Sequence, residues 1–272
     1  MRAFHAYLFA GLLAAYPAAS AHAQTITDEL YNSHHPRLLI TPAELPALQQ
    51  KLTDGGVDDA LYAGVRQTVT TSYPSMSPAA ILGAWYGDQS IPCIGLVAQL
   101  ENDASARALG RVLTTYIADN YEPDTDEANS GMRLRALAIG YDMCFGDASE
   151  AERGHVRDEI VRYIQKMVWT QGYQAFQYQP YLGNHSAMFG AALGLAAIAL
   201  QGEADAPLLD NALAMVDRIV DNLLTYQFDP GGSYNEGAFY AAWTLKQLVY
   251  YFDARHRYDG RTYTDNARLR AV

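Results

Sequence analysis

Apolar and polar residues along the chain recur with the period of an α-helix, and two kinds of helical segment alternate. The first kind has apolar side chains every three or four residues and charged side chains between them, which predicts amphipathic helices. The second kind is apolar or aromatic nearly all round, which predicts buried helices. The amphipathic segments are 104–120, 149–171 and 205–226, and the apolar segments are 129–145, 184–201 and 236–252. Alternation with a period of two is absent from the sequence, so we expect no β-strand.

Local signals mark where several of these helices begin and end. Thr41–Glu44 and Ser149–Glu152 have the residue types of a capping box, with Thr or Ser first and Glu last. Gly202 follows the apolar run Ala187–Leu200, as expected for a glycine that ends a helix. That run is too short to cross a bilayer and is therefore predicted to lie in the protein core.

The alternation of amphipathic and apolar helices is typical of helical hairpins that stand side by side around an axis. We therefore predict an all-α fold, an incomplete (α/α) toroid of helical hairpins with the apolar helices lining the axis. The inner helices of such a ring run in the same direction, so their N-terminal ends open at one mouth. Residues near 129, 184 and 236 then meet in space although they are far apart in the sequence.

The first 23 residues have the three parts of a secretory signal peptide. Arg2 supplies positive charge, Ala6–Ala15 is uncharged and largely apolar, and Ala21–Ala23 forms an A-x-A cleavage site. We expect cleavage after this site, a mature domain over 24–272 and a periplasmic or secreted location. No membrane association is expected after cleavage.

Charge and motif content narrow the function classes. The chain carries 19 Lys and Arg against 30 Asp and Glu, a net charge of −11. An acidic surface argues against nucleic acid as a partner, and an anionic substrate would need positive charge concentrated at its site. The sequence has no metal-binding, nucleotide-binding or nucleophile-elbow motif, so no metal and no other cofactor are expected. Cys93 and Cys144 are favoured as two buried thiols, with pairing left open.

Three clusters of polar and aromatic side chains lie at the predicted mouth. They are Asn129 with Arg133 and Arg135, Asn184-His185 after an aromatic and amide-rich loop that includes Tyr181, and Gly231–Tyr240 with Glu236. Arginines bind carboxylates, and helix N-termini add unpaired N–H donors. Each residue also has a structural interpretation, with Asn184 and Glu236 serving the helix ends and His185 and Tyr240 filling the core.

Four short stretches occur in a distinctive order. They are His35–Thr41, Arg135–Asp142 with the following Ser149–Arg153, Asn184–Ser186, and Glu236–Tyr240 with an E-G-x-x-Y pattern. From about residue 35 to the end, they resemble the helical domain of the heparinase II/III-like polysaccharide lyases, a superfamily that includes alginate lyases. The resemblance implies that Asn184, His185 and Tyr240 are catalytic. Members normally complete the toroid and continue into a β-sandwich, so we expect a truncated toroid without that domain, and some members use a further His or Tyr from beyond this point.

A lyase of this kind cleaves a uronate-containing chain by β-elimination. A base removes the C5 proton beside the carboxylate and the 4-linked oxygen leaves, so neutral or cationic donors must hold the carboxylate and the developing charge. Asn184, with His185 or an arginine, suits this role, and Tyr240 is the expected acid. Tyr240 also serves as the base if both steps occur on one face, and His185 is the competing base. Substrate contacts are expected from Arg133, Arg135, Tyr181 and Glu236.

Two other functions stay open at this point. A glycoside hydrolase on a similar helical ring needs two carboxylates across the sugar, and its candidates are Asp142, Asp229 and Glu236. A non-catalytic carbohydrate-binding protein or an inactive fragment needs no reacting group. The sequence names neither the uronate polymer nor the choice between endo and exo cleavage.

Overall fold

The described part of the chain is built of helices. The computed structural model describes residues 31, 33–53, 55–83, 87, 89–123, 127–169, 183–263 and 265–271. Across these residues no β-strand forms, and the β-type pairing is a single isolated bridge between Phe228 and Tyr234. The predicted all-α class is therefore confirmed. The predicted signal peptide and Tyr181 lie outside the described residues.

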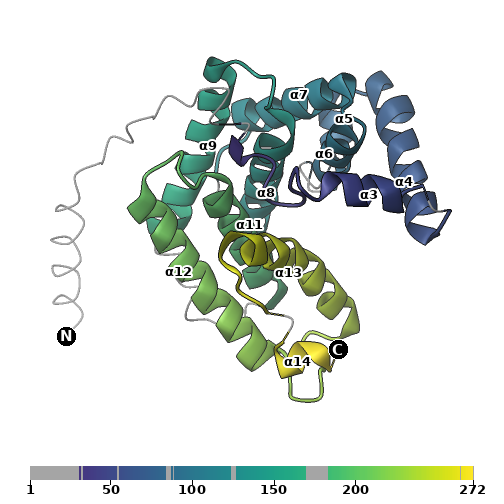
Figure 1. The fold of residues 1–272 in the computed structure, drawn as a ribbon. Coiled ribbons are helices and arrows are strands. Elements are labelled where there is room, and N and C mark those ends of the chain that lie inside the picture. The colour runs from purple at the N-terminus through teal and green to yellow at the C-terminus, as the bar shows by residue number, and fades with distance from the viewer. Residues whose placement is uncertain are drawn as a thin grey trace, which may run out of the picture.

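The main helices form two rows that pack against each other (Figure 1). The first row consists of α6 (Ser90–Leu100), α8 (Glu127–Cys144), α11 (Gly183–Ala199) and α13 (Ala238–Asp259), in which each helix contacts the next. The second row consists of α7 (Ala104–Asn120), α9 (Glu150–Trp169) and α12 (Ala206–Asn222). The first row contains the apolar segments of the sequence and the second row the amphipathic ones.

Shorter helices complete the fold at its two ends. Near the N-terminus α3 and α4 pack against α6, and α5 packs against α7, whereas α14 follows α13. The bounds of these helices are Leu45–Lys51 for α3, Val57–Gln67 for α4, Pro78–Leu82 for α5 and Ala267–Arg270 for α14. Single π-helical turns cover Thr68–Ser72 and Leu223–Gln227, and a short 3-10 helix covers Tyr73–Ser75.

Three first-row helices, α8, α11 and α13, run in the same direction. Gly131 in α8 lies against the backbone of Met188 in α11, where a Cβ would come within 3.2 Å of the carbonyl oxygen. Further along, Gly194 in α11 lies against the ring of Tyr251 in α13, at 2.3 Å from where a Cβ would be. Glycine is thus required for these close approaches. The N-terminal ends of the three helices consequently share one end of the row.

Both predicted capping boxes form, but only the second one begins its helix where the sequence predicts. The hydroxyl of Ser149 caps α9, and the carboxylate of Glu152 accepts both the N–H and the hydroxyl of Ser149 at 2.8 and 2.7 Å. Glu44 likewise accepts from the N–H of Thr41 at 2.7 Å, but α3 begins only at Leu45.

Both cysteines are unpaired, and burial raises the pKa of the Cys144 thiol to about 12. None of the helices in the described ranges is long and apolar enough to span a bilayer.

Candidate functional site

The N-terminal ends of α11 and α13 are joined through one carboxylate. The backbone N–H of Asn184 donates to Oε2 of Glu236 at 2.7 Å, and its side-chain Nδ2 donates to Oε1 at 3.0 Å. Glu236 is not inside α13, as the sequence suggested, but precedes its first residue, Ala238, by two positions. The carboxylate therefore satisfies a donor at the start of α11, where helices carry N–H groups without intrahelical partners.

Gly183 makes this junction possible. Its φ of +50° lies in the left-handed region, and a Cβ on this residue would lie 2.0 Å from Oε2 of Glu236. Both the backbone conformation and the close approach of the carboxylate thus favour glycine at the first position of α11.

A buried tyrosine extends the hydrogen-bond chain behind Glu236. The hydroxyl of Tyr234 donates to Oε2 of Glu236 at 2.9 Å and accepts from the hydroxyl of Thr244 at 3.0 Å. Burial is the main reason that the pKa of Tyr234 is raised well above its usual value, and the carboxylate of Glu236 raises it as well. The hydroxyl therefore stays protonated and acts as a hydrogen-bond donor. Tyr234 belongs to the predicted Gly231–Tyr240 cluster without a role of its own, and Thr244 lies outside it.

Tyr240 follows Glu236 by four residues. It is 43% exposed and occupies the first turn of α13, one helical turn before Thr244 and two before Gln247. Its ring lies edge-on to that of Phe239, with centroids 5.4 Å apart. Among the described residues its hydroxyl has no hydrogen-bond partner. The Tyr240 hydroxyl is therefore accessible to a ligand, and its role as core filler is excluded.

His185 and Asn184 differ in exposure although they are adjacent. His185 is exposed in the first turn of α11, whereas Asn184 is buried and held by Glu236. The interpretation of His185 as a core histidine is therefore wrong.

The two predicted substrate-binding arginines of α8 are buried. Arg135 is 1% exposed, donates to the side-chain oxygen of Gln247 and lies 5.3 Å from the ring centroid of Tyr250. Arg133 donates to the carbonyl of Glu122 at 2.9 Å and lies 4.8 Å from the ring centroid of Tyr121. These contacts hold both guanidinium groups within the protein. They would therefore attract an anion at the mouth through long-range electrostatics and not by direct contact.

Basic and acidic side chains both occur in the N-terminal half of the first row. The sequences of α6 and α11 contain no Asp or Glu, but α8 begins with Glu127, and Glu236 lies at the junction itself. Arg133, Arg135 and Lys246 lie in the N-terminal or middle parts of their helices. An anionic substrate would therefore depend on these three cations for local positive charge.

The carboxylates proposed for a hydrolase do not come together. Asp142 lies near the C-terminal end of α8 and accepts the backbone N–H groups of Arg37 and Leu38 at 3.0 Å each. Asp229 accepts the N–H groups of Gly231 and Ser233 within its own turn, at 2.7 and 3.0 Å. Only Glu236 of the three lies at the junction of α11 and α13, which is a poor fit to a mechanism with two carboxylates.

A second polar cluster, which includes Asp142 of the hydrolase candidates, lies at the opposite end of the first row. His35 contacts two carboxylates, Oδ1 of Asp142 through Nδ1 and Oε1 of Glu203 through Nε2, at 2.6 Å each. Arg37 Nη2 donates to the same Glu203 oxygen at 2.9 Å, and the Tyr141 hydroxyl donates to Glu203 Oε2 at 2.6 Å. We call His35, Arg37, Asp142 and Glu203 the clasp, because it fastens the entry segment to the ends of α8 and α11.

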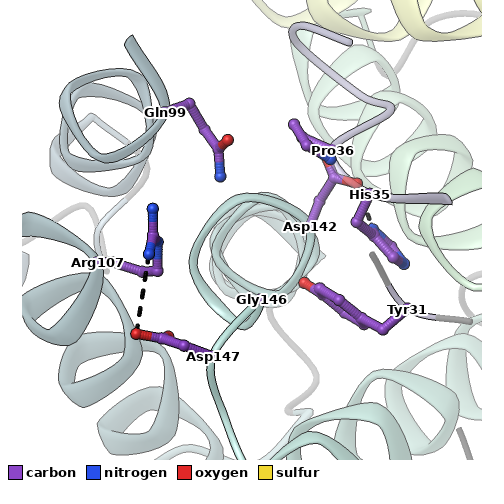
Figure 2. A pocket seen from close by; sticks show the side chains of 8 residues that line it. All are labelled: Tyr31, His35, Pro36, Gln99, Arg107, Asp142, Gly146 and Asp147. Carbon is purple, nitrogen blue, oxygen red and sulfur yellow. Dashed lines mark hydrogen bonds and ion pairs between the residues drawn. The ribbon is translucent and has the colours of Figure 1, made fainter. Parts of the chain in front are cut away.

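A small cavity of about 210 Å³ borders the clasp. In Figure 2, His35 and Asp142 lie on one side of it and Gln99, Arg107 and Asp147 on the other. Gln99 donates to the carbonyl of Met143 at 2.6 Å, and Arg107 lies 3.9 Å from Asp147. The polar groups of this cavity are therefore engaged with the protein, and the cavity lies far from Asn184.

Comparison with known proteins adds no family assignment. No family model matches the chain, and no curated protein matches it either. Within the described ranges, no group of three or more His, Cys, Asp or Glu side chains is arranged to hold a metal ion.

Proposed function

We propose that the chain is the helical part of a polysaccharide lyase that cleaves a uronate-containing polymer by β-elimination. The observation that carries the proposal is the junction of α11 and α13, where Glu236 fixes the Asn184 amide and the exposed Tyr240 follows Glu236 by four residues. The reaction needs an oriented donor that binds the substrate carboxylate and a hydroxyl that transfers a proton. The Asn184 amide and the Tyr240 phenol are groups of these two kinds.

In the proposed reaction the Asn184 amide donates to the substrate carboxylate. Glu236 occupies one N–H of Nδ2 and leaves the other N–H for a ligand. Neutralising the carboxylate lowers the cost of removing the C5 proton, because negative charge develops beside it. His185, exposed in the first turn of α11, is the second donor to this carboxylate or the base.

Tyr240 is the proposed acid. The C5–H electron pair forms the C4–C5 double bond, the bond from C4 to the linking oxygen breaks, and the hydroxyl of Tyr240 protonates that oxygen. If both steps occur on one face, a Tyr240 phenolate first takes the C5 proton and then delivers it to the leaving oxygen. No co-reactant is consumed, and the products are a saturated fragment and one with an unsaturated end.

We further propose that the two rows belong to an incomplete (α/α) toroid with its mouth at the N-terminal ends of α8, α11 and α13. The shared direction of these helices supports this arrangement. Export to the periplasm or the medium, directed by residues 1–23, fits a protein that meets extracellular polysaccharide.

The test is a panel of acidic polysaccharides incubated with the protein. Ultraviolet absorbance of unsaturated uronate ends is expected for at least one polymer. Saturated reducing ends without this absorbance would indicate a hydrolase, and binding without either product would indicate a carbohydrate-binding protein. Both results would contradict the proposal.

A further inference from the structure

We infer that one face of α13 binds a second uronate unit of the same substrate chain. Phe239, Trp243, Lys246 and Tyr250 form this face, which we call the α13 stripe. Lys246 would pair with the sugar carboxylate, and the exposed aromatic surface of the stripe would contact the apolar face of the sugar ring. The inference rests on the proposed function insofar as the ligand is an acidic polysaccharide.

Sequence spacing and ring contacts define the stripe. Its residues are separated by four, three and four positions, so they lie on one side of the helix. The ammonium of Lys246 lies 5.0 Å from the ring centroid of Trp243, and Arg135 of α8 lies 5.3 Å from that of Tyr250. Phe239 is 76% exposed in the first turn of the helix. Each of the two inner rings of the stripe, Trp243 and Tyr250, thus lies next to a cation.

Lys246 is the lysine without an oxygen partner in the described part of the chain. Lys51 pairs with Asp58 at 2.5 Å, and Lys166 donates to the carbonyl of Pro123 at 2.6 Å. Lys246 instead lies over the Trp243 ring. Burial raises the pKa of the nearby Cys93 thiol, and the positive charge of Lys246 partly offsets this rise. A partly buried ammonium without a counter-ion, on a protein of net charge −11, is suited to an incoming carboxylate.

Trp243 is held in place by the neighbouring helix. Its indole N–H donates to the sulfur of Met188 in α11 at 3.2 Å. The ring is thereby fixed in orientation while Lys246 lies over it, so both are preorganised for a ligand. Cation–π contact with Trp243 also holds the ammonium without neutralising it.

The position of Lys246 separates it from the chemistry. It follows Tyr240 by six residues, which is about 9 Å along a helix. This separation is longer than a single sugar ring, so Lys246 would contact a neighbouring unit rather than the unit that is cleaved. Its expected contribution is to the affinity for longer chains and not to turnover.

The experiment measures binding of saturated oligomannuronates of defined length by isothermal titration calorimetry. Lys246→Gln is expected to weaken binding of long oligomers about tenfold, as for loss of a charge-assisted contact. Lys246→Arg keeps the charge and should retain most of the affinity. Lys51→Gln removes a surface lysine elsewhere and should change nothing. Carboxyl-reduced oligomers lack the anion, so their affinity for Lys246→Gln should equal their affinity for the parent.

The outcomes separate this inference from the proposed function. If Lys246→Gln binds long oligomers as tightly as the parent, or if no oligomer binds, the stripe is not a uronate site. If unsaturated ends never appear but Lys246→Gln still loses affinity selectively, the lyase function fails and the site stands. An active enzyme whose Lys246→Gln variant shows an unchanged KM on polymer would overturn the site alone.

Discussion

Asn184 donates both its backbone N–H and its side-chain amide to the carboxylate of Glu236, which lies 52 residues further along the chain. One carboxylate thereby fixes the start of α11 relative to the start of α13. Because Tyr234 donates to the same group, the carboxylate accepts from three donors. Changes at this carboxylate should therefore alter stability as well as the orientation of the amide.

Glu236→Gln tests the junction. Glutamine keeps the shape but replaces one acceptor oxygen with a donor, so at least one of the three hydrogen bonds is lost. We expect a loss of about 1 kcal/mol in the free energy of unfolding, measured by urea denaturation. Glu122→Gln is the control, because Glu122 is an exposed partner of Arg162 on the surface. Equal stability of the two variants would contradict the structural role of Glu236.

Gly183→Ala tests the close approach at the first residue of α11. Alanine must adopt a φ near +50° and also displace the carboxylate of Glu236. Gly260→Ala is the matched control, since its φ is +76° but a Cβ there would meet nothing within 4 Å. The control should cost about 1 kcal/mol for the left-handed backbone alone. A larger loss for Gly183→Ala in the same denaturation assay would report the contact, and equal losses would refute it.

Tyr240→Phe tests the proposed acid. The substitution keeps the ring and removes the proton that moves, so turnover should fall by on the order of 10²–10⁴ while binding survives. Because the hydroxyl has no partner among the described residues, the thermal midpoint should not change. Tyr258→Phe, at an exposed tyrosine near the other end of α13, is the control. An active parent whose Tyr240→Phe variant keeps nearly full turnover would remove Tyr240 from the mechanism.

His185→Ala and Glu236→Gln distinguish the roles of the neighbouring residues. If His185 holds the substrate carboxylate, its loss should weaken both binding and turnover. Under the lyase proposal Glu236→Gln should reduce turnover less than Tyr240→Phe, because Glu236 positions Asn184 and does not react. A hydrolase would reverse that order. Steady-state kinetics on one polymer with all three variants gives the comparison.

The clasp predicts a pH dependence of stability. Burial alone would lower the pKa of His35, but hydrogen bonds with Asp142 and Glu203 outweigh it, and the pKa is raised. A raised folded-state pKa means that the stabilisation is complete below the unfolded value of about 6.5 and is lost as pH rises through the folded value. Urea midpoints should therefore fall on the alkaline side in the parent.

His35→Gln should remove this alkaline dependence and lower the midpoint at neutral pH. His155→Gln is the control, because His155 is half exposed and pairs with Asp119 on the surface. On the acid side, burial alone would raise the pKa of Glu203, but the contacts with His35 and Tyr141 outweigh burial, and the pKa is lowered. The contribution of Glu203 should accordingly be lost as pH falls through its lowered pKa. Identical alkaline profiles for the parent and His35→Gln would refute the account of the clasp.

The recurrence of apolar residues every three or four positions predicts most of the helices, because one side of each helix is buried. The segment 104–120 coincides with α7, and the run Ala187–Leu200 is buried as expected. The end of α13 was missed, because its last turns, up to Asp259, carry charged residues that read as a surface loop. Asn184 and Glu236 were both selected, but their hydrogen bonds depend on how closely α11 and α13 approach, which no local pattern contains.

Long-range packing explains the remaining misses. Arg135 is predicted to contact substrate, whereas α13 lies against α8 and its Gln247 accepts a hydrogen bond from the guanidinium. His35 and Glu203 were not selected as partners, since 168 residues separate them. One signal is present in the sequence: Asp142 is the acid in the otherwise apolar stretch 136–145, and a buried acid requires a partner.

The clasp also sets an order of events during synthesis. The chain emerges from its N-terminus, so His35 is made 107 residues before Asp142 and 168 before Glu203. Until Glu203 has emerged, His35 has only one of its two carboxylates and Arg37 lacks its acid. The entry segment therefore docks fully only after α8 and α11 have both been made. By contrast, the junction of Asn184 and Glu236 spans 52 residues and needs nothing that precedes α11. The entry segment, although it is synthesised before α8 and α11, thus depends on both of them for its final position.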